Sequence, residues 1–266
     1  MSADAPKLLA VENVVAGYGD RRILDGVSFT VDRGEILVIL GGSGSGKSTT
    51  LRTIVGLLPP LEGRVLIRGR DVNAAEPAER DEILRDVGMA FQSAALLNSM
   101  TVADNVALPM IEHWNLDRDT ALMLARMRLA SVGLARAGEK LPSELSGGMR
   151  KRAGLARALA LEPSLLLFDE PSAGLDPITA RELDDLILSL KARRDMGIVT
   201  VTHELGSINT IADRAVMLAE GKVVAAGTLT EVRANPHPLV QAFFRREALP
   251  PREGEKTLLE ELEWRP

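Results

Sequence analysis

The fold is decided by Gly41-Gly-Ser-Gly-Ser-Gly46-Lys47-Ser48, which fits the phosphate-binding loop pattern of a Gly-rich turn that opens a helix. The apolar run Glu35-Ile-Leu-Val-Ile-Leu40 before it predicts a strand, and Lys47 to Leu57 has helical composition. Glycines let backbone N–H groups converge on phosphates, Lys47 supplies a positive charge, and Ser48 offers a ligand to Mg²⁺. A plain Gly/Ser-rich turn is the alternative, but the strand, loop and helix order favours nucleotide binding. The residues expected to bind ATP here are Gly41, Gly42, Ser43, Gly44, Ser45, Gly46, Lys47, Ser48 and Thr49.

Two adjacent acids follow a second apolar run. Leu165-Leu-Leu-Phe168 predicts a buried strand that delivers Asp169 and Glu170 at its carboxyl end, where ligands bind in open α/β sheets. We expect Asp169 to hold Mg²⁺ and Glu170 to orient and deprotonate the attacking water. The alternative is that both acids only cap the following turn.

A second Gly-rich segment, Leu145-Ser-Gly-Gly-Met149, also precedes a predicted helix. Such a start is a second anion site, and a single nucleotide does not need two. Two chains arranged head to tail would let Ser146, Gly147 and Gly148 of one touch the γ-phosphate held by the other. A simple N-cap role for Ser146 is compatible with this arrangement.

Composition limits the classes of protein. The chain has 266 residues, 45% of them hydrophobic and 26% charged, which predicts one folded α/β unit with an appended subdomain. A formal charge of -5 argues against nucleic acid as the main partner, and the lack of Cys excludes disulfides and thiolate metal sites. Met1 to Val15 does not read as a secretory signal, and no apolar run is long enough to span a membrane. We therefore expect a cytosolic protein, and if it acts at a membrane, another chain does the spanning.

The remaining pattern predicts the layout around these motifs. Alternating residues in Leu8 to Val15 and Val27 to Val31 indicate antiparallel strands around a turn at Gly17-Tyr18-Gly19-Asp20. Residues from Thr101 to about Leu161 have helical periodicity. Further strands are expected at 63–69, 87–91, 198–201, 215–218 and 222–226, with an amphipathic helix through Leu183, Leu186, Ile187 and Leu190.

With these motifs in this order, the chain resembles the ATP-binding subunits of ABC transporters over nearly its whole length. The resemblance implies an α/β P-loop NTPase with a RecA-like core, an antiparallel β edge and an inserted helical subdomain at about 94–161. It implies that Tyr18 stacks on adenine and that Gln92 is a ligand of Mg²⁺ and water that reports to the membrane subunit. It also implies that Asp176 crosses a dimer interface and that His203 contacts the γ-phosphate.

Two segments are similar to the ATPases of Mla-type systems, which work with MCE-domain proteins to move lipid between bacterial membranes. They are Phe91-Gln-Ser-Ala-Ala-Leu-Leu-Asn-Ser-Met-Thr-Val-Ala-Asp-Asn-Val106 and Leu145-Ser-Gly-Gly-Met-Arg-Lys-Arg-Ala153, where Met149 replaces the Gln of most ABC ATPases. This resemblance implies an ATPase homodimer, an MlaE-like permease, an MCE-domain subunit and a STAS-domain accessory subunit. It places the chain on the cytoplasmic face of the inner membrane. Ala94 to Leu97 would help to dock a permease helix, with a core role as the alternative.

Two other functions stay open at this point. An ATPase of a small-solute importer would carry the same motifs, because other subunits read the substrate. A soluble ABC ATPase acting in DNA repair or translation is disfavoured by the acidic charge and by the single nucleotide-binding unit.

The predicted domain covers 1–246, and 247–266 forms a tail. The tail holds Pro250-Pro251 and the apolar residues Leu258, Leu259, Leu262 and Trp264 among six Glu. We expect it to act as an assembly clasp, with a disordered solvated tail as the alternative.

Overall fold

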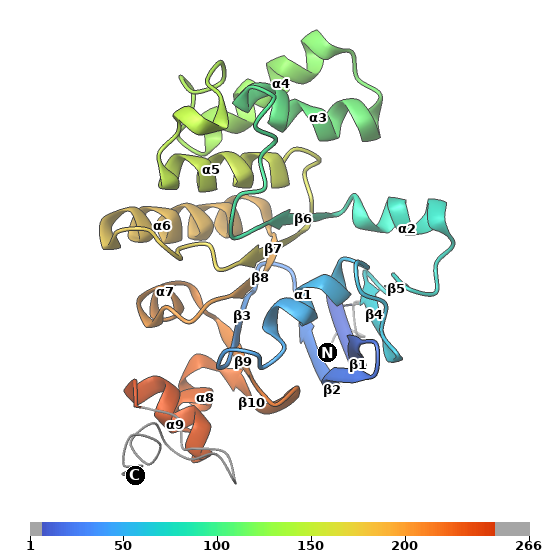
Figure 1. Ribbon diagram of the computed structural model, residues 1–266, viewed down its shortest axis with the longest axis vertical. Helices are drawn as coiled ribbons and strands as arrows, with labels where there is room; N and C mark the ends of the chain where they lie inside the picture. Colours follow the sequence, from blue (N-terminus) through green and yellow to red (C-terminus); the bar gives the residue numbers. More distant parts are fainter. Residues whose placement is uncertain (1–6, 248–266) are drawn as a thin grey trace, which may run out of the picture.

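The computed structural model describes residues 7–247, and Figure 1 shows a helical part stacked on a part that contains all the strands. The central sheet has the order β10-β9-β3-β8-β7-β6. Five of its strands are parallel, and β10 pairs antiparallel with β9. The strands are β3 (Ile36–Leu40), β6 (Val87–Ala90), β7 (Leu165–Asp169), β8 (Gly197–Val201), β9 (Arg214–Ala219) and β10 (Lys222–Thr228).

The strand before the phosphate-binding loop is buried on both faces. Ile36, Val38 and Leu40 of β3 belong to a core shared with the helices, whereas Leu37 and Ile39 belong to a core shared with a second sheet. All five residues are fully buried, and each such side chain contributes about 1.5–3 kcal/mol to stability. This explains why the run is continuously apolar: it is the middle of a three-layer structure.

The second sheet is antiparallel and has the order β2-β1-β4-β5. Its apolar face packs with α1 and α2 against the central sheet. The predicted turn at Gly17 to Asp20 is shorter than expected, because Gly17 and Tyr18 still pair with β2 and the chain reverses at Gly19 and Asp20. The elements are β1 (Leu9–Tyr18), β2 (Arg21–Val31), α1 (Lys47–Ile54), β4 (Glu62–Ile67), β5 (Arg70–Asp71) and α2 (Pro77–Leu84).

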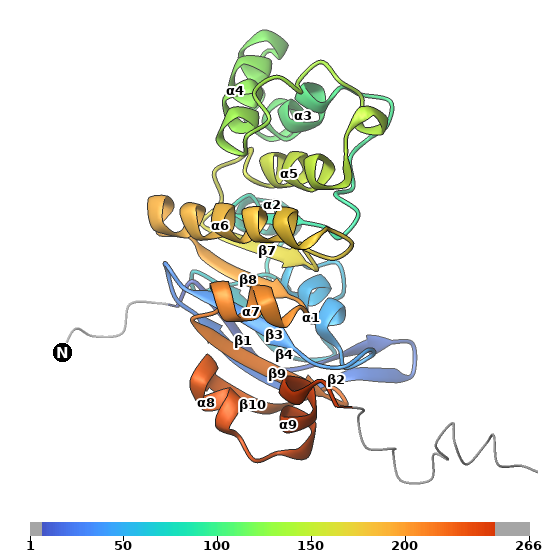
Figure 2. The same ribbon diagram turned by 90° about the vertical axis from the view of Figure 1, so that its left-hand side faces the viewer.

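Helices α3, α4 and α5 lie together beyond the β6 edge of the central sheet, as both ribbon views show (Figures 1 and 2). Along the chain they fall between β6 and β7, where helical periodicity was predicted. Two of these helices have side-chain N-caps: Thr101 accepts from the backbone N–H of Asp104, and Ser146, as the sequence allows, accepts from that of Met149. These elements are α3 (Val102–Trp114), α4 (Arg118–Ser131), the 3-10 turn η1 (Pro142–Glu144) and α5 (Gly147–Ala158).

Helix α6 connects β7 to β8 and forms with them the predicted parallel β-α-β unit. Leu183, Ile187 and Leu190 are its buried stripe. The predicted hairpin of β9 and β10 is present, but it does not end the fold, because α8 follows and packs on both strands, and α9 packs on α8. The remaining helices are α6 (Pro177–Arg194), α7 (Leu205–Ile211), α8 (Leu229–Ala234) and α9 (Pro238–Arg245).

Candidate functional site

The phosphate-binding loop joins the carboxyl end of β3 to the start of α1. Its glycines are required by close contacts: a Cβ on Gly41 would lie 2.3 Å from the carbonyl oxygen of Leu218, and one on Gly46 would lie 2.5 Å from a methyl of Leu24. Gly41, Gly44 and Gly46 also have positive φ angles, which disfavour other residues. The loop therefore presents bare backbone at a helix start, with Ser43 and Ser48 exposed.

Lys47 lies over this loop. Its Nζ donates to the carbonyl oxygens of Gly41 at 2.9 Å and Gly42 at 2.8 Å. Burial lowers the pKa of the Lys47 ammonium, while the nearby carboxylates of Glu170 and Asp169 oppose that shift. The loop, the lysine and the two acids thus occupy one site.

The acids at the end of β7 face the start of α1. Ser48 donates through its Oγ to Asp169 Oδ1 at 3.4 Å. Burial raises the pKa of Asp169, and the neighbouring Glu170 raises it further, while Ser48, Arg52 and Lys47 act in the opposite direction. Two hard oxygen donors beside a phosphate loop fit Mg²⁺, which takes few protein ligands and several from phosphate and water. Residues 7–247 contain no cluster of three or more His, Cys, Asp or Glu that could hold a metal ion.

Glu170 and His203 form the most direct contact between the predicted catalytic residues. The Nδ1 of His203 lies 2.9 Å from Oε1 and 2.8 Å from Oε2 of Glu170. The Glu170 side chain is only 15% exposed, whereas His203 is 57% exposed and reaches it from the loop after β8. Glu170 also has a φ of 53°, an unusual backbone conformation for a residue with a Cβ. A half-buried carboxylate is thus held beside an accessible imidazole at the mouth of the phosphate loop.

Lys151 is a residue that the sequence analysis missed. From α5 its Nζ donates to the backbone carbonyl oxygen of Glu170 at 3.0 Å, which ties the helix after Ser146 to the loop of the acids. Burial lowers the pKa of Lys151, and the charge of Glu170 acts against that change. Its spacing of five residues from Ser146 is the only sequence signal, and it does not by itself identify a contact.

Tyr18 ends β1 with its ring 47% exposed. Its hydroxyl accepts a hydrogen bond of 2.8 Å from Nη1 of Arg52, a second residue that the sequence did not single out. Arg52 belongs to α1, the helix that the phosphate loop opens, so the aromatic ring is held next to that helix with a face available for stacking.

Gln92 is exposed and lies two residues beyond β6, the strand beside β7, at the same sheet edge as Asp169 and Glu170. The loop that follows is tightly held, since Ala94 and Ala95 both have positive φ and Ala94 is buried against Gly154 of α5. Arg157, also of α5, donates to the carbonyl oxygen of Ala95 at 2.7 Å. The loop of Gln92 is therefore seated on the same helix that begins at Ser146.

Ser146 and Asp176 both act as N-caps within the chain. The Asp176 carboxylate accepts from the backbone N–H groups of Ile178 and Thr179 at 3.1 and 3.0 Å. A Cβ on Gly148 would lie 2.6 Å from a methyl of Thr179, so the starts of α5 and α6 are in close contact. Among the described residues, no hydrogen bond joins Ser146, Gly147, Gly148 or Asp176 to the phosphate loop of the same chain. The structure thus brings together the loop, both acids, His203 and Tyr18, and leaves this second group apart.

Comparison with known proteins agrees with this geometry. The ABC transporter family matches residues 24–173. The MlaF ATP-binding protein of the intermembrane phospholipid transport system of Escherichia coli (strain K12) is 42% identical over 244 residues, or 92% of this chain and 91% of that protein. Among solved structures, cbiO1 of Clostridium perfringens, part of the ABC transporter complex cbiONQ, has a TM-score of 0.78 at 28% identity, covering 90% of this chain and 96% of that one. The dimeric bacterial ABC transporter cassette MJ0796 has a TM-score of 0.77 at 32% identity, covering 83% and 98%. These likenesses confirm the predicted P-loop fold, and the chain belongs to the ABC transporter family of ATP-binding proteins.

Proposed function

We propose that the chain is the ATP-hydrolysing subunit of a bacterial transporter that moves phospholipid between membranes. The main observation behind this proposal is the contact between Glu170 and His203 beside the phosphate loop. ATP hydrolysis needs this arrangement of residues. The lipid substrate is supported by the identity to MlaF proteins, whose name states that substrate.

At this site the chain's own residues divide the chemistry between them. The loop amides and Lys47 hold the β- and γ-phosphates, and the ring of Tyr18 stacks on adenine. Glu170 accepts a proton from the attacking water, and His203 orients the γ-phosphate and the carboxylate. Ser48, Asp169 and Gln92 are the candidate ligands of Mg²⁺, which neutralises charge on the phosphates when it is bound.

The second group of residues belongs to a homodimer with two ATP sites. Ser146, Gly147 and Gly148 start α5 with exposed or half-exposed backbone, and their chain's own phosphate loop makes no hydrogen bond with them. Ile178, beside Asp176, is 74% exposed, an unusual position for a large apolar side chain. The likeness to a dimeric cassette supports placing both against a partner chain.

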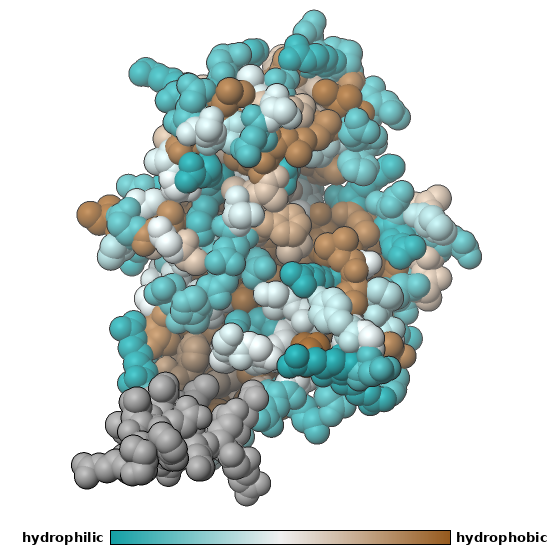
Figure 3. All heavy atoms as spheres, viewed as in Figure 1, coloured by the Kyte–Doolittle hydropathy of each residue, from teal (hydrophilic) through white to brown (hydrophobic). Residues whose placement is uncertain are grey.

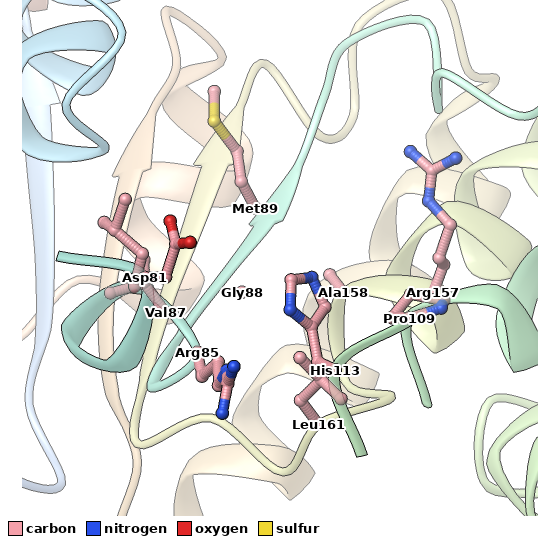
Figure 4. Close-up of a pocket in the computed structure, with 11 residues that line it drawn as sticks. Asp81, Arg85, Val87, Gly88, Met89, Pro109, His113, Arg157, Ala158 and Leu161 are labelled. Atoms are coloured by element: carbon pink, nitrogen blue, oxygen red, sulfur yellow. The ribbon is translucent and has the colours of Figure 1, made fainter. Parts of the chain in front are cut away.

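A groove between the two parts of the molecule is the proposed seat of a permease helix. It has a volume of about 330 Å³ and is lined by residues of α2, β6, α3 and α5. Figure 3 shows apolar side chains gathered in the middle of this face, and Figure 4 shows His113 between Arg85 and Arg157. Burial lowers the pKa of Arg157, whose partner is a carbonyl oxygen rather than a carboxylate. The lining also contains the carboxylate of Asp81, so a permease helix that packs here would meet groups of both charges.

The Mla likeness also supports finer proposals on assembly. They are an MlaE-like permease, an MCE-domain subunit, a STAS-domain accessory subunit and a location on the cytoplasmic face of the inner membrane. Within residues 7–247, no helix combines the length and the apolar character needed to cross a bilayer. We also propose that the ATP-binding domain spans residues 1–246, with its helical subdomain at about 94–161, and that the tail acts as an assembly clasp. Residues 248–266, which include Leu258 to Trp264, lie outside the described residues.

Purification of the tagged chain from membranes of its host tests this function. Mass spectrometry of the co-purifying proteins should find an MlaE-like permease and an MCE-domain protein, and extraction should find bound phospholipid. A Lys47→Ala chain serves as a control, because it should lose its hold on the phosphates of ATP while its permease-facing groove is unchanged. Recovery of a permease with a soluble solute-binding protein instead would replace lipid transport by small-solute import.

A further inference from the structure

A buried polar cluster lies behind the catalytic contact and has no role in the function proposed above. It consists of Ser172 on the loop after β7, Asp184 on α6 and Ser207 on α7. Their side chains come from segments that are far apart in the chain, and their relative exposures are only 4%, 3% and 5%. All three line one cavity of about 340 Å³ between α6 and α7. Polar groups buried to this degree are costly unless they have partners.

The hydrogen bonding of the cluster links the loop after β7 to helix α7. Ser207 donates through its Oγ to Ser172 Oγ at 3.3 Å. Burial raises the pKa of the Asp184 carboxyl, and a hydrogen bond from Ser207 opposes that rise. One carboxyl oxygen of Asp184, Oδ1, is buried with no hydrogen-bond partner among the described residues. Because a hydroxyl carries one proton, Ser207 can donate to Ser172 or to Asp184, but not to both.

The position of this cluster in the chain connects it to the catalytic pair. Ser172 lies two residues after Glu170, and Ser207 lies four residues after His203. The loop of Glu170 and the segment that runs from His203 into α7 are therefore joined twice: once by the exposed contact of Glu170 with His203, and once by the buried pair of hydroxyls. The buried bond is anchored on α6, the helix that Asp176 caps at the proposed dimer face.

We propose that Ser172, Ser207 and Asp184 form an inner tie, and that this tie holds His203 in position against Glu170 during hydrolysis. The three are positioning residues, since none lies in the catalytic contact itself. The tie has two arrangements, because the Ser207 hydroxyl can donate its hydrogen bond either to Ser172 or to Asp184. A shift of α6 at the dimer face would thereby move His203. This inference rests on the proposed ATP-hydrolysing function.

The test uses the full chain in its transporter complex with the variants Ser207→Ala, Asp184→Leu and Asp184→Asn. The matched control is Asp185→Asn, which removes the same charge from the next residue, an exposed one bonded to Arg181. The first two variants should lower kcat about fivefold to tenfold, the effect of roughly one hydrogen bond, with KM for ATP unchanged. Asp184→Asn keeps a hydrogen-bonding oxygen and should retain most of the parent kcat, and the control should match the parent.

A second readout follows His203 itself. The sequence has three histidines, so an NMR spectrum of the histidine-labelled chain is simple, and a His203→Ala variant assigns the signal. The tie predicts that Ser207→Ala and Asp184→Leu shift the His203 signal, whereas Asp185→Asn leaves it in place. An unmoved signal, or parent kcat in both Ser207→Ala and Asp184→Leu, would overturn the inner tie. A parent chain that hydrolyses no ATP would instead overturn the proposed function.

Discussion

Burial acts in opposite senses on the two charged groups at the phosphate end of the site. It lowers the pKa of the Lys47 ammonium and raises that of the Asp169 carboxyl, so both neutral forms are favoured relative to free side chains. A bound phosphate brings negative charge to Lys47, and a bound metal ion brings positive charge to Asp169. Ligand binding therefore moves the pKa of each residue back toward its ordinary value and favours the charged form.

The raised pKa of Asp169 predicts how binding depends on pH. Only the ionised carboxylate can hold Mg²⁺, and Asp169 takes up a proton at a higher pH than an ordinary Asp, whose pKa is about 3.9. The gain in ATP affinity that Mg²⁺ gives should therefore shrink as pH falls, and should do so before ordinary carboxylates protonate. Isothermal titration with and without Mg²⁺ at several pH values measures this gain.

Asp169→Asn is the control for that experiment, because it leaves the protonation of ATP itself unchanged. Its Mg²⁺ gain should be small at every pH. A parent curve parallel to that of Asp169→Asn would show that Asp169 is not a metal ligand.

Tyr18 offers a test of adenine binding. Tyr18→Ala should weaken ATP binding by about 1–3 kcal/mol, by analogy with base stacking on aromatic rings. Tyr18→Phe should recover most of this, since the bond from Arg52 holds the ring but does not form the stacking face. Equal ATP affinity for parent and Tyr18→Ala, measured by equilibrium titration, would leave Tyr18 as a structural residue of the turn.

At the level of elements, α5 connects the parts of the site. Its start carries Ser146, its middle donates through Lys151 to Glu170, and its last turn holds the Gln92 loop through Gly154 and Arg157. One helix thus contacts the proposed dimer face, the catalytic loop and the loop beside the groove. A rotation of this helix would therefore displace residues at all three places.

A substitution at Gly154 tests how closely the Gln92 loop packs on α5. A Cβ there would lie 3.0 Å from the Cβ and the carbonyl oxygen of Ala94, so the loop or the helix must shift. Gly154→Ala should therefore lower the melting temperature, by about 2–4 °C for each kcal/mol lost in a domain of this size. Gly206→Ala in α7 is the matched control, because its added Cβ meets no atom within 4 Å and should raise stability slightly. Melting temperatures equal to or above that of the parent for both variants would contradict the close packing of the Gln92 loop on α5.

Sequence reasoning located the elements that have strong periodicity or fixed chemistry. β3 and β7 were recognisable because strands buried on both faces are continuously apolar, and α3 and α4 because each shows helical spacing. Helices α7, α8 and α9 were missed, since helices of six to eight residues give too few turns to show a period.

The prediction of site residues from the sequence has a similar limit. Motifs identified Lys47 and Glu170 because their chemistry requires those residue types, and the family resemblance identified His203. Lys151, Arg52 and Arg157 could not be found in this way, since each acts through a backbone carbonyl or a hydroxyl brought near by packing. Any exposed basic residue of a helix would look the same in the sequence.

For the whole molecule, the central proposal is that one chain leaves the ATP site incomplete. The phosphate loop, Asp169, Glu170 and His203 lie together, while Ser146 and Asp176 are satisfied only as caps of their own helices. The partner's copy of that second group would supply further donors to a γ-phosphate. Dimer formation should therefore require ATP.

The proposed clasp gives a prediction on assembly. Deletion of the residues after Ala248 should weaken the dimer or the transporter complex, because each buried Leu or Trp contributes about 1.5–3 kcal/mol before ordering costs. ATP binding by the single chain should be unchanged, since the described site lies within residues 18–203. Size-exclusion chromatography with light scattering compares the two chains, and unchanged assembly would favour the solvated tail.

The most direct test of the account is the Glu170→Gln chain with ATP, followed by phosphate release and by light scattering. Replacing the base should slow hydrolysis by about 10²- to 10⁴-fold while ATP still binds. The variant should then accumulate as an ATP-bound dimer, whereas Lys47→Ala should fail to bind ATP and remain a monomer. Phosphate release at the parent rate by Glu170→Gln, with unchanged ATP affinity, would contradict the assignment of Glu170 as the base that acts between two joined chains.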